Sequence, residues 1–169
     1  MKNSEVIDEV ALKIAEEAVP DEIDLAPIMA QAFIQGGKER EELFKREEGS
    51  LTGGFGTGEF IAVFPYILKG LVKSGPFIYK LLTTDVADIV SLINEVLELI
   101  EKGREKKKKV LQDNPYKPLK TVIHTISTEL ELSGLPQERC ELITYRVLRA
   151  LLDKPDESTI FIKALEGGK

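Results

Sequence analysis

The stretch EFIAVFPYILKGLVK, residues 59–73, has the fullest helical pattern in the chain. Its apolar side chains recur at intervals of three and four residues, which places them on one face of an α-helix. This apolar face consists of Phe60, Ile61, Phe64, Ile67, Leu68, Leu71 and Val72. Pro65 lies inside the pattern, so we expect a kink or an early break there. A turn at residues 74–76 and an apolar patch at 77–82 follow.

Helical periodicity extends outward from this stretch in both directions. Toward the N-terminus it predicts helices over 4–18 and 24–35, with a short continuation over 38–48. Toward the C-terminus it predicts a long helix from 83 to about 109, whose apolar residues approach a heptad repeat. No segment alternates apolar and polar residues over a useful strand length. The sequence therefore predicts an all-α protein, an irregular helical bundle of about six to seven helices.

The clearest internal boundary falls at residues 110–118. Asn114-Pro115 and Lys117-Pro118 disfavour helix on both sides of this segment. The helices predicted beyond it cover residues 119–132, 136–153 and 156–165. We therefore expect an N-terminal helical region, 1–112, and a C-terminal three-helix region, 113–169. One continuous domain is the alternative.

A glycine-rich loop, GSLTGGFGTG, occupies residues 49–58. Five glycines in ten residues leave the backbone few restraints, so the loop is predicted to act as a hinge. The hinge glycines are Gly53, Gly54, Gly56 and Gly58. The loop fails the GxGxxG pattern because Glu59 occupies the third glycine position, and the chain contains no GxxxxGK[ST] motif. A hinge is therefore favoured over a phosphate-binding loop.

The chain has 169 residues and a net charge of −6, and this charge is unevenly distributed. Residues 1–50 contain 6 basic and 13 acidic groups, a net charge of −7. An acidic surface repels phosphate, which argues against nucleic acid as the main partner. The basic cluster at 102–109 is typical of a solvated helix end. Because we see neither an apolar run of spanning length nor an apolar leader, we expect a cytoplasmic protein.

Side chains that could carry chemistry are few. A single cysteine, Cys140, and a single histidine, His124, exclude a disulfide framework and metal sites that need several thiolates or imidazoles. His124 is expected on a polar helix face, and Cys140 in an apolar stripe where a thiol is a poor nucleophile. We find no pattern of catalytic residues, and we expect a non-enzymatic protein without cofactor or metal. An enzyme whose site leaves no sequence pattern is the alternative.

Two sets of side chains are expected to contact partners. The first set is the apolar face of segment 59–82 with its flanking lysines, namely Phe60, Phe64, Ile67, Leu68, Leu71, Lys69 and Lys73. A basic amphipathic helix of this kind fits a partner's groove or a membrane surface. The second set, on one flank of a C-terminal helix, is Arg139, Arg146 and Arg149, which fits an acidic partner. The alternatives are a central core helix for the first set and solvated or intramolecular ion pairs for the second.

These observations favour a non-enzymatic helical module for protein–protein interaction, such as an adaptor or a regulatory subunit. Its expected partner is another protein or a second copy of the chain. The alternative function is a membrane-active effector, in which the glycine-rich loop releases segment 59–82 onto lipid. Spanning the bilayer is excluded, because the fifteen helical residues of 59–73 reach only about 22 Å of a hydrocarbon core roughly 30 Å thick.

Overall fold

The computed structural model describes residues 2–45, 62–84, 86–102 and 117–167. Within these residues it contains nine α-helices, one short 3-10 helix and no strand, so the all-α prediction is confirmed. The elements are α1 (Lys2–Ala18), η1 (Pro20–Glu22), α2 (Ala26–Gln35), α3 (Gly37–Leu43), α4 (Phe64–Lys73), α5 (Gly75–Thr83), α6 (Val86–Glu101), α8 (Lys117–Glu131), α9 (Gln137–Asp153) and α10 (Pro155–Gly167). The number of helices is above the expected six to seven.

Two prolines in segment 59–82 account for part of the difference between the observed and the expected number of helices. Pro65 lies in the first turn of α4, and Pro76 lies in the first turn of α5. Proline costs no hydrogen bond there, because the first N–H groups of a helix have no acceptor within the helix. Pro65 therefore begins a helix instead of kinking one, and Ala62 and Val63 precede α4 as non-helical residues. The apolar patch at 77–82 likewise belongs to a helix of its own.

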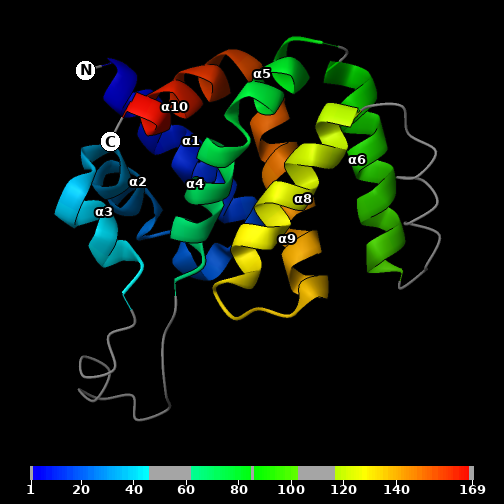
Figure 1. The fold of residues 1–169 in the computed structure, drawn as a ribbon. Coiled ribbons are helices and arrows are strands. Elements are labelled where there is room, and N and C mark those ends of the chain that lie inside the picture. The colour runs from blue at the N-terminus through cyan, green and yellow to red at the C-terminus, as the bar shows by residue number, and fades with distance from the viewer. Residues whose placement is uncertain (1, 46–61, 85, 103–116, 168–169) are drawn as a thin grey trace.

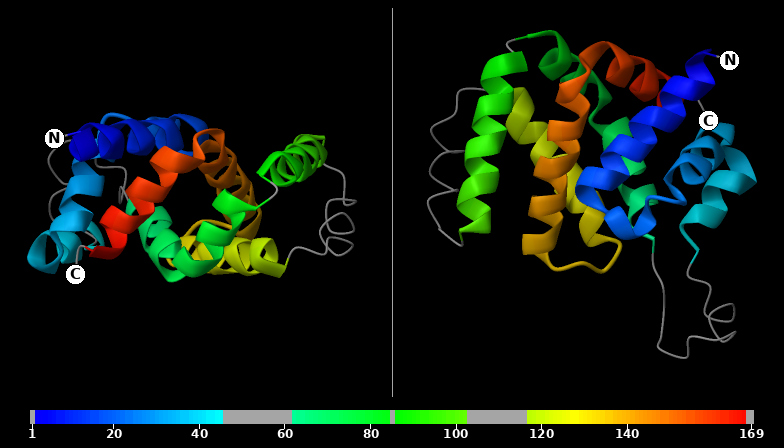
Figure 2. Two further views of the ribbon diagram at one scale, coloured as in Figure 1. Left: turned by 90° about the horizontal axis from the view of Figure 1, so that it is seen from above. Right: turned by 180° about the vertical axis from the view of Figure 1, so that it is seen from behind.

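The helices form two layers with further helices around them (Figure 1). In one layer α4 packs against α8, and in the other α1 packs against α9. Helices α5 and α10 cross one end of these layers, α6 lies against α9 on one side, and α2 and α3 lie on the other (Figure 2). The α4–α8 contact is close because Gly70 has no side chain: a Cβ atom added there would lie 3.0 Å from the Cα atom of Ile126.

A single hydrophobic core connects the layers. All described helices except α3 contribute fully or nearly fully buried apolar side chains to it. Its largest fully buried side chains include Tyr145, Phe33, Phe64 and Phe161. The three C-terminal helices therefore share one core with the N-terminal helices.

Several sequence predictions lie outside the described residues. The hinge glycines Gly53, Gly54, Gly56 and Gly58, together with Phe60 and Ile61, fall within 46–61. Most of the basic cluster and most of the proline-containing boundary fall within 103–116.

A buried carboxylate holds the start of α4. Glu22 of η1 is only 5% exposed, and its two oxygens accept hydrogen bonds from the backbone N–H groups of Val63 and Phe64, each at 2.8 Å. These donors have no acceptor within α4, and the partial positive charge of a helix N-terminus favours an anion. Burial nevertheless raises the pKa of the Glu22 carboxyl above its ordinary value of 4.5, because the ionised form loses hydration, while the two backbone hydrogen bonds oppose this shift.

The raised pKa of Glu22 predicts a pH dependence of stability. The folded chain binds the Glu22 proton more tightly than the unfolded chain, so the contribution of Glu22 to the free energy of unfolding decreases as pH rises from 4.5 through the raised pKa. In Glu22→Gln this contribution is absent and all other titrating groups remain. We expect the difference in unfolding free energy, wild type minus variant, to decrease between about pH 4.5 and pH 7 in urea titrations. A difference that grows with pH would contradict the raised pKa.

Candidate functional site

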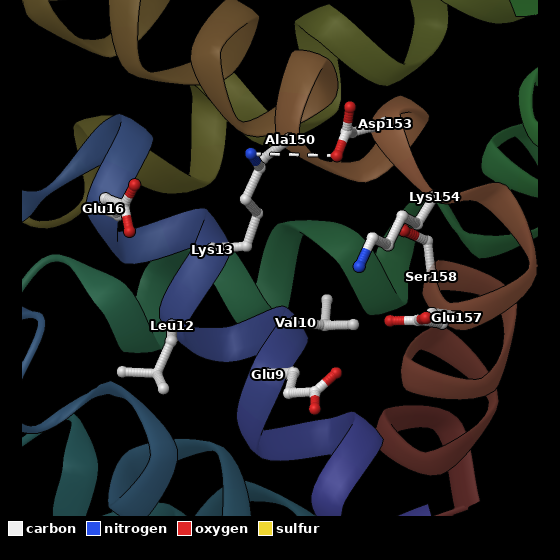
Figure 3. Close-up of a pocket in the computed structure, with 10 residues that line it drawn as sticks. All are labelled: Glu9, Val10, Leu12, Lys13, Glu16, Ala150, Asp153, Lys154, Glu157 and Ser158. Atoms are coloured by element: carbon white, nitrogen blue, oxygen red, sulfur yellow. Dashed lines mark ion pairs between the residues drawn. The ribbon is translucent and has the colours of Figure 1, made fainter.

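An open pocket of about 520 Å³ lies between the middle of α1, the end of α9 and the start of α10 (Figure 3). Its ten lining residues are Glu9, Val10, Leu12, Lys13, Glu16, Ala150, Asp153, Lys154, Glu157 and Ser158. Seven of these ten side chains are charged or polar, and only Val10, Leu12 and Ala150 are apolar. The side chains of Lys154 and Glu157 point from the α9–α10 corner toward α1. We refer to this feature as the α1–α10 pocket.

The α9–α10 corner has a fixed local structure. Lys154 alone separates the two helices, because Pro155 disfavours helix in the residue before it and itself begins α10. The hydroxyl of Ser158 donates a hydrogen bond of 2.6 Å to the carbonyl oxygen of Leu151, which satisfies one acceptor at the end of α9. The pocket is therefore built on helices whose positions are set by the core and by this corner.

The pocket carries an excess of negative charge. Four carboxylates and two ammonium groups line it, a net charge of −2. Lys13 is already paired, at 3.8 Å from Asp153 and 3.5 Å from Glu17. Within the described part of the chain, no ion pair engages Glu9, Glu16 or Glu157. The C-terminal end of α9 carries a partial negative charge and the N-terminal end of α10 a partial positive charge. These two contributions oppose each other, so the charged side chains determine the sign of the electrostatic potential in the pocket.

Exposed aliphatic side chains lie beside these charges. Leu12, at the edge of the pocket, is 38% exposed, and Ile28 of α2 is 67% exposed. The side chain of Gln31 donates a hydrogen bond of 3.2 Å to Asp8, which joins α2 to α1. Leu12 and Ile28 each lie one turn from this bond, so they occupy neighbouring turns of two helices in contact. From the Gln31–Asp8 bond and the helix spacing we infer that Ile28 lies near Leu12, at the edge of the pocket.

A second, smaller pocket of about 240 Å³ surrounds the one histidine. It is lined by Lys120, Ile123, His124, Ser127, Thr128, Glu131, Gln137 and Glu141. The hydroxyl of Ser127 shares a hydrogen bond of 3.1 Å with that of Thr144, which in turn donates to the carbonyl oxygen of Cys140. No hydrogen bond between Ser127 and His124 occurs among the described residues, so they do not form a nucleophile–base pair here.

The structure places four side chains of the apolar face of segment 59–73 in the core. Phe64, Ile67, Leu68 and Leu71 are fully buried, and α4 packs against α8, α2 and α10. This is the core-helix alternative raised by the sequence. In this conformation these four side chains offer no surface to a partner or to a membrane.

Lys69 and Lys73 are ion-pair partners within the chain. The ammonium group of Lys73 lies 2.5 Å from one oxygen of Glu129, and that of Lys69 lies 3.7 Å from the other. The side chain of Glu129 is only 5% exposed, and within the described residues its Oε1 atom accepts no hydrogen bond. Lys69 also lies 5.4 Å from the ring centre of Phe44, a cation–π contact. The two lysines therefore compensate a buried carboxylate.

The three arginines of α9 have different surroundings. Arg149 pairs with Glu17 of α1 at 3.1 Å and contacts Asn94 of α6 at 3.4 Å, which is the intramolecular alternative raised by the sequence. Arg139 is exposed and Arg146 is half-buried. Only these two remain available for an acidic partner. No sequence motif pointed to the α1–α10 pocket, and the acidic composition of residues 1–50 was its one indirect signal.

Comparisons with known proteins assign no function. No protein-family model, no curated protein and no solved structure matches this chain. Within the described residues, no group of three or more His, Cys, Asp and Glu side chains is placed to hold a metal ion. None of the described helices combines the length and the apolar composition needed to cross a membrane.

Proposed function

We propose that the protein is a non-enzymatic helical module for protein–protein interaction, an adaptor or a regulatory subunit. We further propose that its partner protein binds at the α1–α10 pocket. The observation that carries this proposal is the exposed side chain of Leu12 at the edge of an open pocket, on helices fixed by the core. An apolar spot surrounded by polar groups is the usual composition of a non-obligate protein interface.

The composition of the pocket favours a protein over a small molecule. Small-molecule sites enclose most of the ligand and are lined mainly by apolar and aromatic side chains. The α1–α10 pocket is open, contains no aromatic side chain, and has seven polar or charged residues among its ten. A protein segment can lie across such a surface and extend beyond it.

Filling the pocket tests this function. Ala150 forms part of the pocket wall, so Ala150→Phe places a ring in the space that the partner would occupy. Ala87→Phe is the matched control, because Ala87 is exposed on α6, away from the pocket. We expect tagged wild type and Ala87→Phe to capture the same partner from extracts of the source cells, and Ala150→Phe to lose at least about nine-tenths of it.

Ala150 is buried, so Ala150→Phe could lose capture because the chain misfolds. A second pair of variants separates a folding defect from a binding defect. Leu12→Ser changes an exposed side chain at the pocket edge, and Leu132→Ser changes one that is 55% exposed beyond the opposite end of α9. We expect only Leu12→Ser to weaken capture, with unchanged circular dichroism in both variants. If all four variants capture the same proteins as the wild type, the pocket is not the interaction site and the proposed function fails.

A further inference from the structure

Three carboxylates that line the α1–α10 pocket have no ion pair among the described residues. Glu9 and Glu16 come from α1 and Glu157 comes from α10. Glu9 and Glu16 are seven residues apart, which is two helical turns or about 10 Å along α1. Lys13 lies between them, but Asp153 and Glu17 already engage its charge. Lys154 also points into the pocket (Figure 3), so a cation that enters meets six charged side chains with a net charge of −2.

The walls of the pocket also accept an aliphatic chain. Val10 and Ala150 are almost fully buried, and their exposed atoms form an apolar wall beside the carboxylates. Lysine and arginine both pack a methylene chain on such a surface and keep the charged end in contact with polar groups. Arginine fits better, because its planar guanidinium has five N–H donors and can bind two carboxylates at once.

The charge of the whole chain argues for a partner other than a second copy. The net charge is −6, and residues 1–50 alone, which include α1 and α2, carry −7. Two copies brought together at this surface would repel each other, whereas a basic segment would be attracted. Leu12 and Ile28 provide an apolar contact beside the charged site.

Building on the proposed function, we propose that the partner is a basic segment that inserts an arginine side chain into the α1–α10 pocket. A neighbouring aliphatic side chain of the same segment packs on Leu12 and Ile28. The chemistry recognised is a guanidinium group next to an apolar side chain, presented by a helix or an extended peptide.

The probe is a synthetic amphipathic peptide of leucine and arginine, titrated calorimetrically into the full chain. An identical peptide with citrulline in place of arginine keeps the shape of the side chain and removes its charge. We expect the arginine peptide to bind with a Kd below about 1 mM, and the citrulline peptide to bind at least about tenfold more weakly. A lysine peptide should bind with intermediate affinity, since its ammonium group is a point charge.

Charge variants of the protein locate the binding. Glu9→Gln combined with Glu157→Gln removes two carboxylates from the pocket, and we expect the affinity for the arginine peptide to fall about tenfold. The control is Glu95→Gln combined with Glu101→Gln, which removes the same charge from the exposed surface of α6. The control should change the affinity by less than about twofold.

Four results would overturn the inference. Equal weakening by the two double variants would mean that binding follows net charge alone. Equal affinity for the arginine and citrulline peptides would mean that the guanidinium is not recognised. No binding of the arginine peptide up to about 1 mM would exclude the site outright. Dimerisation that Ala150→Phe abolishes, seen by sedimentation, would make a second copy the occupant. The proposed function is separable from these outcomes, because it fails only if partner capture does not depend on Ala150 or Leu12.

Discussion

Replacing Phe64 with alanine should lower the free energy of unfolding by about 3–5 kcal/mol. The ring is fully buried at the start of α4, so truncation removes its packing contacts and leaves a cavity. Folded domains have net stabilities of about 5–15 kcal/mol, so this loss would be a large fraction of the total. Urea unfolding followed by circular dichroism should show a much lower midpoint with an unchanged slope.

Phe77→Ala is the matched control for this prediction. Phe77 lies on α5 and is 37% exposed, so its truncation removes less buried area and leaves no closed cavity. We expect a loss below about 1.5 kcal/mol. If Phe64→Ala proved as mild as Phe77→Ala, α4 would not be a core helix in solution. The membrane-active alternative for segment 59–82 would then regain support.

Reversing the charge of both Lys69 and Lys73 should cost at least about 3 kcal/mol. The two lysines compensate Glu129, whose side chain is 5% exposed. In Lys69→Glu combined with Lys73→Glu, three carboxylates would be close together and one of them would be buried. A thermal or urea unfolding curve measures the loss.

Two further variants show whether Glu129 is the cause. Lys80→Glu reverses an exposed lysine on α5 and should change the free energy of unfolding by no more than about 0.5 kcal/mol. Adding Glu129→Gln to the double reversal removes the buried charge, and we expect it to restore most of the lost stability. A double reversal without effect would mean that the ion pairs are absent in solution.

Local patterns in the sequence predicted the helices well, because the spacing of apolar residues directly reports which face of a helix is buried. The segments predicted at 4–18 and 136–153 correspond to α1 and α9 within two residues at each end. The role of Pro65 could not be predicted in the same way. Whether a proline kinks a helix or begins one depends on what accepts the preceding N–H groups, and here the acceptor is Glu22, 41 residues earlier.

Long-range partners limited the prediction of the candidate site. In the sequence, Lys73 has no evident ion-pair partner. In the folded chain its partner is Glu129, which is 56 residues away in the sequence. Arg149 pairs with Glu17 across 132 residues. The α1–α10 pocket has the same origin, since its walls come from opposite ends of the described chain. The acidic composition of the first fifty residues was the only feature of the sequence that indicated an acidic site such as this pocket.

The packing of α1 against α9 and α10 has a consequence for the order of folding. Most helical proteins fold rapidly because their contacts join residues that are close in sequence. Here α1 packs on its neighbour α2 and also on α9 and α10, which lie more than a hundred residues later, as the 132-residue separation of Glu17 and Arg149 shows. Closing so long a loop costs conformational entropy, and this cost precedes the stabilisation that the new contacts provide. We therefore expect the contacts of α1 with α9 and α10 to form late, so that a chain interrupted before α9 leaves part of the apolar face of α1, which includes Ile7, Val10 and Ile14, open to other unfinished chains.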